Sequence, residues 1–163
     1  MKNKFYIGID PSMTSTGLII LDNDYNIVVQ KNITSDSKLL NEERIKNIGD
    51  ELIHEIDKIT DDKFVCIEGI SFGSIGRGVA QQAALNFYIR ILLLKHDILY
   101  VICEPSTLKK FVTGKGQCKK DLMLMKTFKK WKVEFENSDV CDAYGLARFG
   151  KDGKSSLNDK KNK

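Results

Sequence analysis

The sequence predicts a mixed α/β domain in which a five-stranded sheet carries helices on both faces. Three short apolar runs near the N-terminus, at residues 5–9, 17–21 and 27–30, are joined by tight links, a pattern typical of antiparallel strands. Two later strand-like runs, at residues 64–68 and 99–103, alternate with helical patterns, which is typical of parallel strands joined by crossovers. We therefore expect three antiparallel strands followed by two parallel ones.

Helical periodicity accounts for the segments between and after these strands. Over residues 41–59, apolar residues recur every three or four positions with charges elsewhere, so one face of this helix can pack on the sheet. The later helices are expected at residues 79–94, from Pro105, at 119–131, and from a cap at Asn137-Ser138 to residue 149.

The composition is that of a single globular domain, with 163 residues of which 42% are hydrophobic. We assign residues 1–149 to this domain and 150–163 to a basic tail that we expect to be disordered. The longest apolar run, at 89–94, is too short to cross a bilayer, and no signal peptide precedes the first strand, so we expect no membrane partner. Four cysteines without CxxC spacing favour reduced thiols over a disulfide frame or a zinc site.

Lysine is concentrated in one segment of the chain. Residues 109–132 contain nine lysines and one acid, and residues 150–163 contain five lysines and two acids. Because the whole chain has a net charge of only +4, the remainder is acidic. A basic belt on an acidic body indicates a polyanionic partner, of which nucleic acid is the first candidate. A solvated helix face is the plainer alternative.

Acidic residues end two of the predicted strands. Asp10 follows the run at 5–9, and Glu68 ends the run at 64–68. If these strands are parallel neighbours, the crossover through the helix at 41–59 brings both carboxylates to one edge of the sheet. Taken alone, Asp10 is equally well explained as a turn residue, because Asp-Pro begins turns.

Two further acids begin the last predicted helix. Asp139 and Asp142 are three residues apart and therefore share a helical face. Acids at a helix N-terminus stabilise it, which explains these two but not the acids at the strand ends. Four converging carboxylates repel one another unless divalent cations neutralise them, and Mg²⁺ and Mn²⁺ prefer such oxygen ligands. Two such ions can support phosphoryl displacement, so acids beside lysines indicate a metal-dependent nuclease.

The stretches GIDPSMTSTG, CIEG and DVCDA, in this order and spacing, resemble the RuvC family of Holliday junction resolvases within the ribonuclease H-like superfamily. The likeness covers about residues 4–149. It implies a ribonuclease H-like fold and a Mg²⁺-dependent endodeoxyribonuclease, with Mn²⁺ as a substitute, that uses two ions per active site. It also implies a homodimer that resolves four-way DNA junctions by paired symmetric nicks and uses no small-molecule cofactor. The implied catalytic, metal-binding residues are Asp10, Glu68, Asp139 and Asp142.

The same resemblance assigns residues to DNA contacts. The segment STLKKFVTGKGQCKKDLM is similar to one that carries two DNA-contacting lysines, which align with Lys109 and Lys120. We expect Lys120 to act in catalysis as well, by neutralising charge on the reacting phosphate. Phe72, in a Gly-Ser loop after Glu68, either stacks on an unpaired base or folds back onto the sheet edge. The predicted DNA-binding residues are Lys109, Lys115, Lys119, Lys120, Phe72 and Arg77.

The helix expected at 79–94 is apolar on more than one face, which fits either a position deep in the core or contact with a partner chain. Because the resemblance implies a dimer, we expect this helix to supply the interface. The predicted interface residues are Ala80, Ala83, Ala84, Phe87 and Ile91.

Two other functions remain as alternatives. One is a junction-binding module whose catalysis has decayed. The other is a fragment of an actin-like ATPase, whose phosphate loop the opening motif also resembles; such enzymes need two domains of this kind, and no GxxxxGK[ST] loop is present. A composition rich in lysine, asparagine and isoleucine suggests an AT-rich bacterial or phage genome, and hence the cytoplasm of a bacterial or phage-infected cell.

Overall fold

A computed structural model of the chain describes residues 3–71 and 76–153. One mixed sheet has its strands in the order β3-β2-β1-β4-β5. Its strands are β1 (Lys4–Asp10), β2 (Thr16–Leu21), β3 (Ile27–Ile33), β4 (Asp62–Glu68) and β5 (Leu99–Cys103). The first three pair antiparallel, whereas β4 runs parallel to both β1 and β5. The predicted fold class is therefore confirmed.

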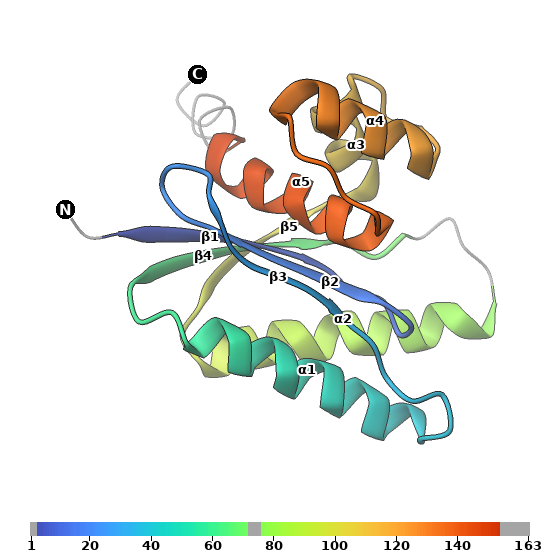
Figure 1. Cartoon of the computed structure of the whole chain (residues 1–163). Coiled ribbons are helices and arrows are strands. Elements are labelled where there is room, and N and C mark those ends of the chain that lie inside the picture. The colour runs from blue at the N-terminus through green and yellow to red at the C-terminus, as the bar shows by residue number, and fades with distance from the viewer. Residues whose placement is uncertain (1–2, 72–75, 154–163) are drawn as a thin grey trace, which may run out of the picture.

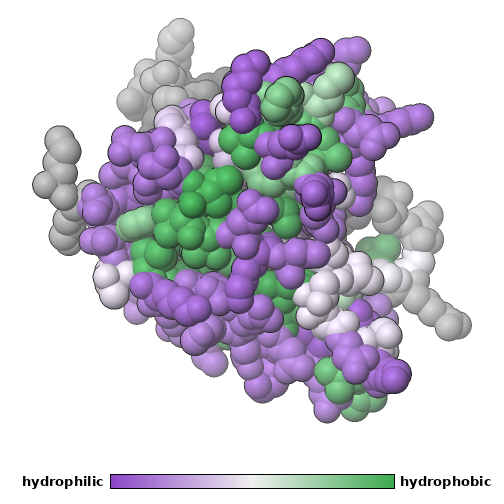
Figure 2. All heavy atoms as spheres, in the orientation of Figure 1, coloured by the Kyte–Doolittle hydropathy of each residue, from purple (hydrophilic) through white to green (hydrophobic). Residues whose placement is uncertain are grey.

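Helices cover both faces of the sheet. They are α1 (Asn41–Asp57), α2 (Arg77–Lys95), α3 (Pro105–Thr113), α4 (Lys120–Trp131) and α5 (Ser138–Asp152). Figure 1 shows α1 and α2 on one side of the sheet and α3, α4 and α5 on the other. Most of the view in Figure 2 is hydrophilic, with hydrophobic residues gathered over the middle of the sheet.

The last helix is longer than its sequence pattern predicts, ending at Asp152 and not at residue 149. Polar contacts extend it: the Tyr25 hydroxyl donates to Asp152 Oδ1 over 2.5 Å, and Arg148 Nε lies 3.3 Å from Asp152 Oδ2. The predicted boundary at residue 150 thus falls inside α5. Residues 154–163 of the predicted tail lie outside the described part of the chain.

Helix α2 divides its apolar residues between two faces. Leu85, Ile89 and Leu93 are almost fully buried and pack in the core between the sheet and α1. Phe87 and Ile91, from the predicted interface stripe, are each 51% exposed. Phe87 and Ile91 therefore do not belong to the core of this chain.

The structure describes all four cysteines. They form no disulfide; Cys66, Cys103 and Cys141 are buried and Cys118 is partly buried. Across residues 3–71 and 76–153, no helix combines the length and hydropathy that a membrane span requires.

Candidate active site

Parallel pairing of β1 and β4 brings two acids together at one end of the sheet. The register pairs Ile9 with Ile67, so the next residues, Asp10 and Glu68, lie side by side. Asp10 is only 7% exposed, and the two carboxyl groups are hydrogen-bonded to each other. The predicted convergence of these strand ends is confirmed, so Asp10 is more than a turn residue.

Helix α5 lies directly on the sheet because two strand residues have no side chain. A Cβ on Gly8 would stand 1.8 Å from the carbonyl oxygen of Ala143, and one on Gly17 would stand 2.1 Å from that of Asp139. Both distances are far below any tolerable contact, so only glycine permits this close approach. The N-terminal half of α5, with Asp139 and Asp142, is thereby held over the ends of β1 and β2.

The cap of α5 fixes where these acids begin. As predicted, the Asn137 side chain accepts hydrogen bonds from the backbone N–H groups of Asp139 (2.8 Å) and Val140 (3.0 Å). This arrangement satisfies two N–H groups that a helix start leaves unpaired and aligns the helix from Ser138 onward.

The acids perturb one another strongly. Burial, followed by the charges of Glu68 and Asp142, raises the pKa of Asp10 well above its ordinary value. Burial also raises the pKa of Glu68, although the hydrogen bond from Asp10 opposes this. The pKa of Asp142 rises to about 7 because of burial and the charges of Glu68 and Asp139. All four predicted acids therefore belong to one electrostatic unit.

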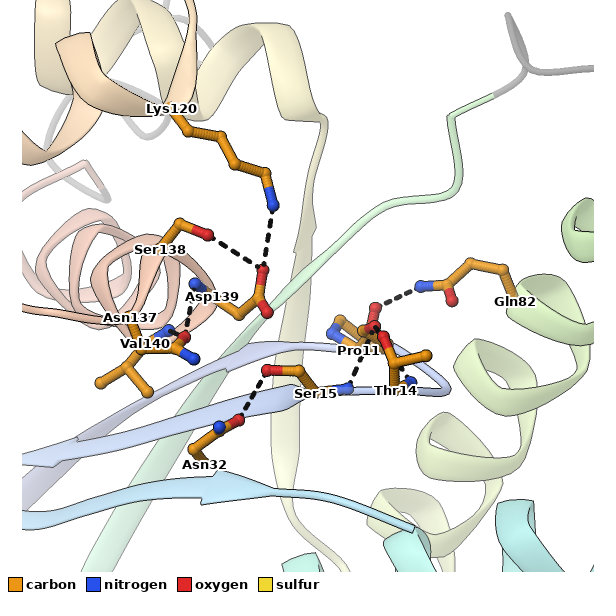
Figure 3. A network of polar contacts seen from close by, with 11 residues as sticks. Pro11, Thr14, Ser15, Asn32, Gln82, Lys120, Asn137, Ser138, Asp139 and Val140 are labelled. Atoms are coloured by element: carbon orange, nitrogen blue, oxygen red, sulfur yellow. Dashed lines mark hydrogen bonds and ion pairs between the residues drawn. The ribbon is translucent and has the colours of Figure 1, made fainter. Parts of the chain in front are cut away.

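Two of the predicted lysines face this unit. Lys120 Nζ lies 3.6 Å from Asp139 Oδ1, and Figure 3 shows its side chain extending from α4 toward the acid. The charge of Lys109, on α3, lowers the pKa of both Glu68 and Asp142. The structure thus places both lysines beside the acids.

The four other predicted DNA-binding residues belong to the segment between α3 and α4 and to the segment that follows β4. Lys115 and Lys119 are exposed in the segment between α3 and α4. Arg77 is the first residue of α2, and its side chain is not described. Phe72 lies outside the described residues.

The chemistry of the acids fits a divalent cation. Among the described residues, no three acidic, histidine or cysteine side chains are already arranged to hold a metal ion. The carboxylates instead pair off, Asp10 with Glu68 and Asp139 with Lys120. Carboxylate oxygens are the ligand type that Mg²⁺ and Mn²⁺ prefer, and a cation among Asp10, Glu68 and Asp142 would offset the burial and mutual repulsion that raise their pKa values.

Sequence reasoning missed a fifth acid. Glu104 directly follows β5, and its charge contributes to the raised pKa of Glu68. Its Oε1 would be 2.8 Å from a Cβ on Gly69, so the glycine after Glu68 leaves room for this carboxylate. The signal was present in the sequence, because Glu104 ends an apolar strand as Asp10 and Glu68 do.

Two amide side chains of α2 were also missed. Gln82 Nε2 donates to the carbonyl oxygen of Pro11, a contact visible in Figure 3, and Asn86 Nδ2 donates to that of Glu68 over 2.8 Å. Both acceptors adjoin or belong to the acids at the strand ends. In the sequence, only the presence of Asn86 within an apolar helix could have indicated such a contact.

Comparison with known proteins places this geometry in context. Residues 6–148 match the profile of a protein family described as "Crossover junction endodeoxyribonuclease RuvC". A protein of that name from Ehrlichia ruminantium (strain Gardel) is 34% identical over 128 residues, which cover 71% of this chain and 75% of the relative.

Solved structures agree on the fold. The Thermus thermophilus RuvC structure superposes with a TM-score of 0.71 over 88% of this chain and 90% of that one, at 15% identity. The T. thermophilus RuvC in complex with a Holliday junction substrate gives a TM-score of 0.72 over 90% and 91%, also at 15% identity.

Proposed function

The chain belongs to the RuvC family of crossover junction endodeoxyribonucleases, and from that premise we propose that it resolves Holliday junctions by hydrolysing DNA strands at the branch. The observation that carries this proposal is the cluster of acids from β1, β4 and α5. Burial and mutual repulsion raise the pKa values of Asp10, Glu68 and Asp142, and a divalent cation would relieve that repulsion. Two lysines beside the acids can neutralise the negative charge of DNA phosphates.

We assign the metal-binding role to Asp10, Glu68, Asp139 and Asp142, with Mg²⁺ as the natural ion, Mn²⁺ as a substitute, and two ions per site. When bound, such ions activate water and stabilise charge on the reacting phosphate. The burial of Asp10 excludes bulk water from the base of the site, which strengthens every electrostatic interaction there.

The lysines have distinct roles in this proposal. Lys120 is 72% exposed and only weakly paired with Asp139, so its ammonium group is free to move to a phosphate. Lys109 is half-buried, and its charge reaches Glu68 and Asp142, so it seats the backbone close to the acids. Lys115 and Lys119 are exposed nearby and extend the phosphate-binding surface away from the site.

We further propose that the protein works as a homodimer whose interface is the exposed stripe of α2. Phe87, Ile91 and Leu94 are 51%, 51% and 62% exposed on this helix, a large apolar surface for a chain in water. A two-fold pairing of such stripes would bury them and present two active sites to the two opposed strands of a junction. This arrangement would account for paired symmetric nicks.

One experiment tests the function and its main alternative together. Labelled four-way junctions, three-way junctions, forks and plain duplexes of equal length are incubated with the protein in Mg²⁺ and, separately, in EDTA. We expect the four-way junction to be cut fastest, the duplex to remain intact, and no cleavage in EDTA. Tight junction binding without cleavage in either Mg²⁺ or Mn²⁺ would support a binding module whose catalysis has decayed.

A further inference from the structure

Helix α2 contributes none of the clustered acids, but it is hydrogen-bonded to the chain at the ends of both β1 and β4, where Asp10 and Glu68 lie. Gln82 and Asn86 are four residues apart on α2 and therefore share a face of the helix. The first donates to the carbonyl of Pro11, the residue after Asp10, and the second to the carbonyl of Glu68 itself. A single helix thus links the two positions whose carboxyl groups meet in the site, and Figure 3 shows the first of these contacts, between Gln82 and Pro11.

Asn86 is a residue that core packing alone does not explain. It is only 2% exposed and stands between the buried core residues Leu85 and Ile89. Its Oδ1 is buried and, among the described residues, has no hydrogen-bond partner. Burying a half-satisfied amide costs free energy that leucine would avoid, so the contact from Nδ2 to Glu68 must supply something that leucine cannot.

We propose that Gln82 and Asn86 are positioning residues, which set the separation of the Asp10 and Glu68 carboxyl groups and thereby the affinity of the site for divalent cations. This inference rests on the proposed function, since it concerns the same acids. Replacing a residue that holds a metal ligand in position by a hydrogen bond typically lowers the metal affinity by about 10- to 100-fold. The amides act here through the backbone of the acid-bearing segments, because each bonds a main-chain oxygen.

The test removes each donor while keeping the size of the side chain. Gln82→Met and Asn86→Leu lose the N–H groups, and Gln81→Met makes the same chemical change one residue away as a control. Mn²⁺ binding is measured by calorimetry on DNA-free protein, and the melting temperature is measured in EDTA. We expect each test variant to bind Mn²⁺ about 10-fold more weakly, with Gln81→Met within two-fold of the wild type.

Two readouts separate positioning from simple structural support. A structural role alone lowers the melting temperature in EDTA but leaves the Mn²⁺ affinity of the folded protein unchanged, and that result would overturn the proposal. Gln82 is only half-buried, so Gln82→Met decides the question even if Asn86→Leu does not fold. If the wild-type protein binds Mn²⁺ but cuts no junction, the proposed function is refuted, and the comparison of Mn²⁺ affinities still tests the positioning role. If the wild-type protein binds no Mn²⁺, the positioning role is overturned too.

Discussion

Replacing Asp142 with asparagine should stabilise the protein when no metal is present, and the gain should grow as the pH rises from about 4 to 7. The carboxyl group has a pKa of about 7 in the folded chain, against 3.8 as its ordinary value, because it is buried beside Glu68 and Asp139. Asparagine has nearly the same shape and carries no charge. The variant therefore keeps the packing and removes the repulsion.

The sign and size of the effect follow from linkage. Below pH 4 the group is protonated in both the folded and unfolded states and contributes nothing. As pH rises from about 4 to 7, the unfolded chain ionises first, so the free energy of unfolding falls, and the full cost applies above pH 7. A shift of about 3 pH units at ~1.36 kcal/mol each sets an upper limit of about 4 kcal/mol. For a chain of this size, that corresponds to roughly 8–16 °C in melting temperature.

The assay is thermal unfolding in EDTA at pH 5 and pH 8. We expect Asp142→Asn to melt well above the wild type at pH 8 and by a clearly smaller margin at pH 5. The control Asp61→Asn, at an exposed position before β4, should change neither value. Added Mg²⁺ should raise the melting temperature of the wild type more than that of the variant. An equal gain at both pH values, or no gain at pH 8, would refute the electrostatic reasoning.

Three further outcomes are expected. Lys120→Ala should slow cleavage of bound junction and reduce the salt dependence of binding by about one unit of slope, whereas an unchanged slope would remove Lys120 from the phosphate contacts. Phe87→Asp should sediment as a monomer and make unpaired nicks; a variant that stays dimeric would place the interface elsewhere. Gly8→Ala should lose at least about 3 kcal/mol of stability in denaturant titrations, because its Cβ would stand 1.8 Å from a backbone oxygen, while Gly78→Ala, which meets nothing within 4 Å, should cost little.

The sheet and the convergence of Asp10 with Glu68 were predictable because both follow from chain order. Antiparallel strands joined by short links must be neighbours, and a strand–helix–strand connection makes parallel strands whose ends meet at one edge. The acids of α5 were predictable as a pair on one helical face. Their distance from the sheet was not, because it depends on Gly8 and Gly17, whose role becomes visible only when α5 lies against them.

Contacts that depend on side-chain direction across the fold were beyond the sequence pattern. Gln82 looks like an ordinary polar residue of a helix, and Asn86 shows only that it is polar among apolar neighbours. The partners of both become visible when α2 is placed beside the ends of β1 and β4. The end of α5 was placed too early, because the contact between Tyr25 and Asp152 joins residues 127 positions apart. Glu104 is different: the rule that singled out Asp10 and Glu68 applied to it as well, and could have been used.

In the proposed mechanism the acids perform the cleavage and are not needed to hold the DNA. The most direct measurement is the rate of strand cleavage of a four-way junction in Mg²⁺, with wild-type protein and Asp10→Asn each at a concentration that saturates the junction. We predict that the wild type cuts the bound junction and that Asp10→Asn binds it at least as tightly but does not cut it. Cleavage by Asp10→Asn at a rate near that of the wild type would contradict this mechanism.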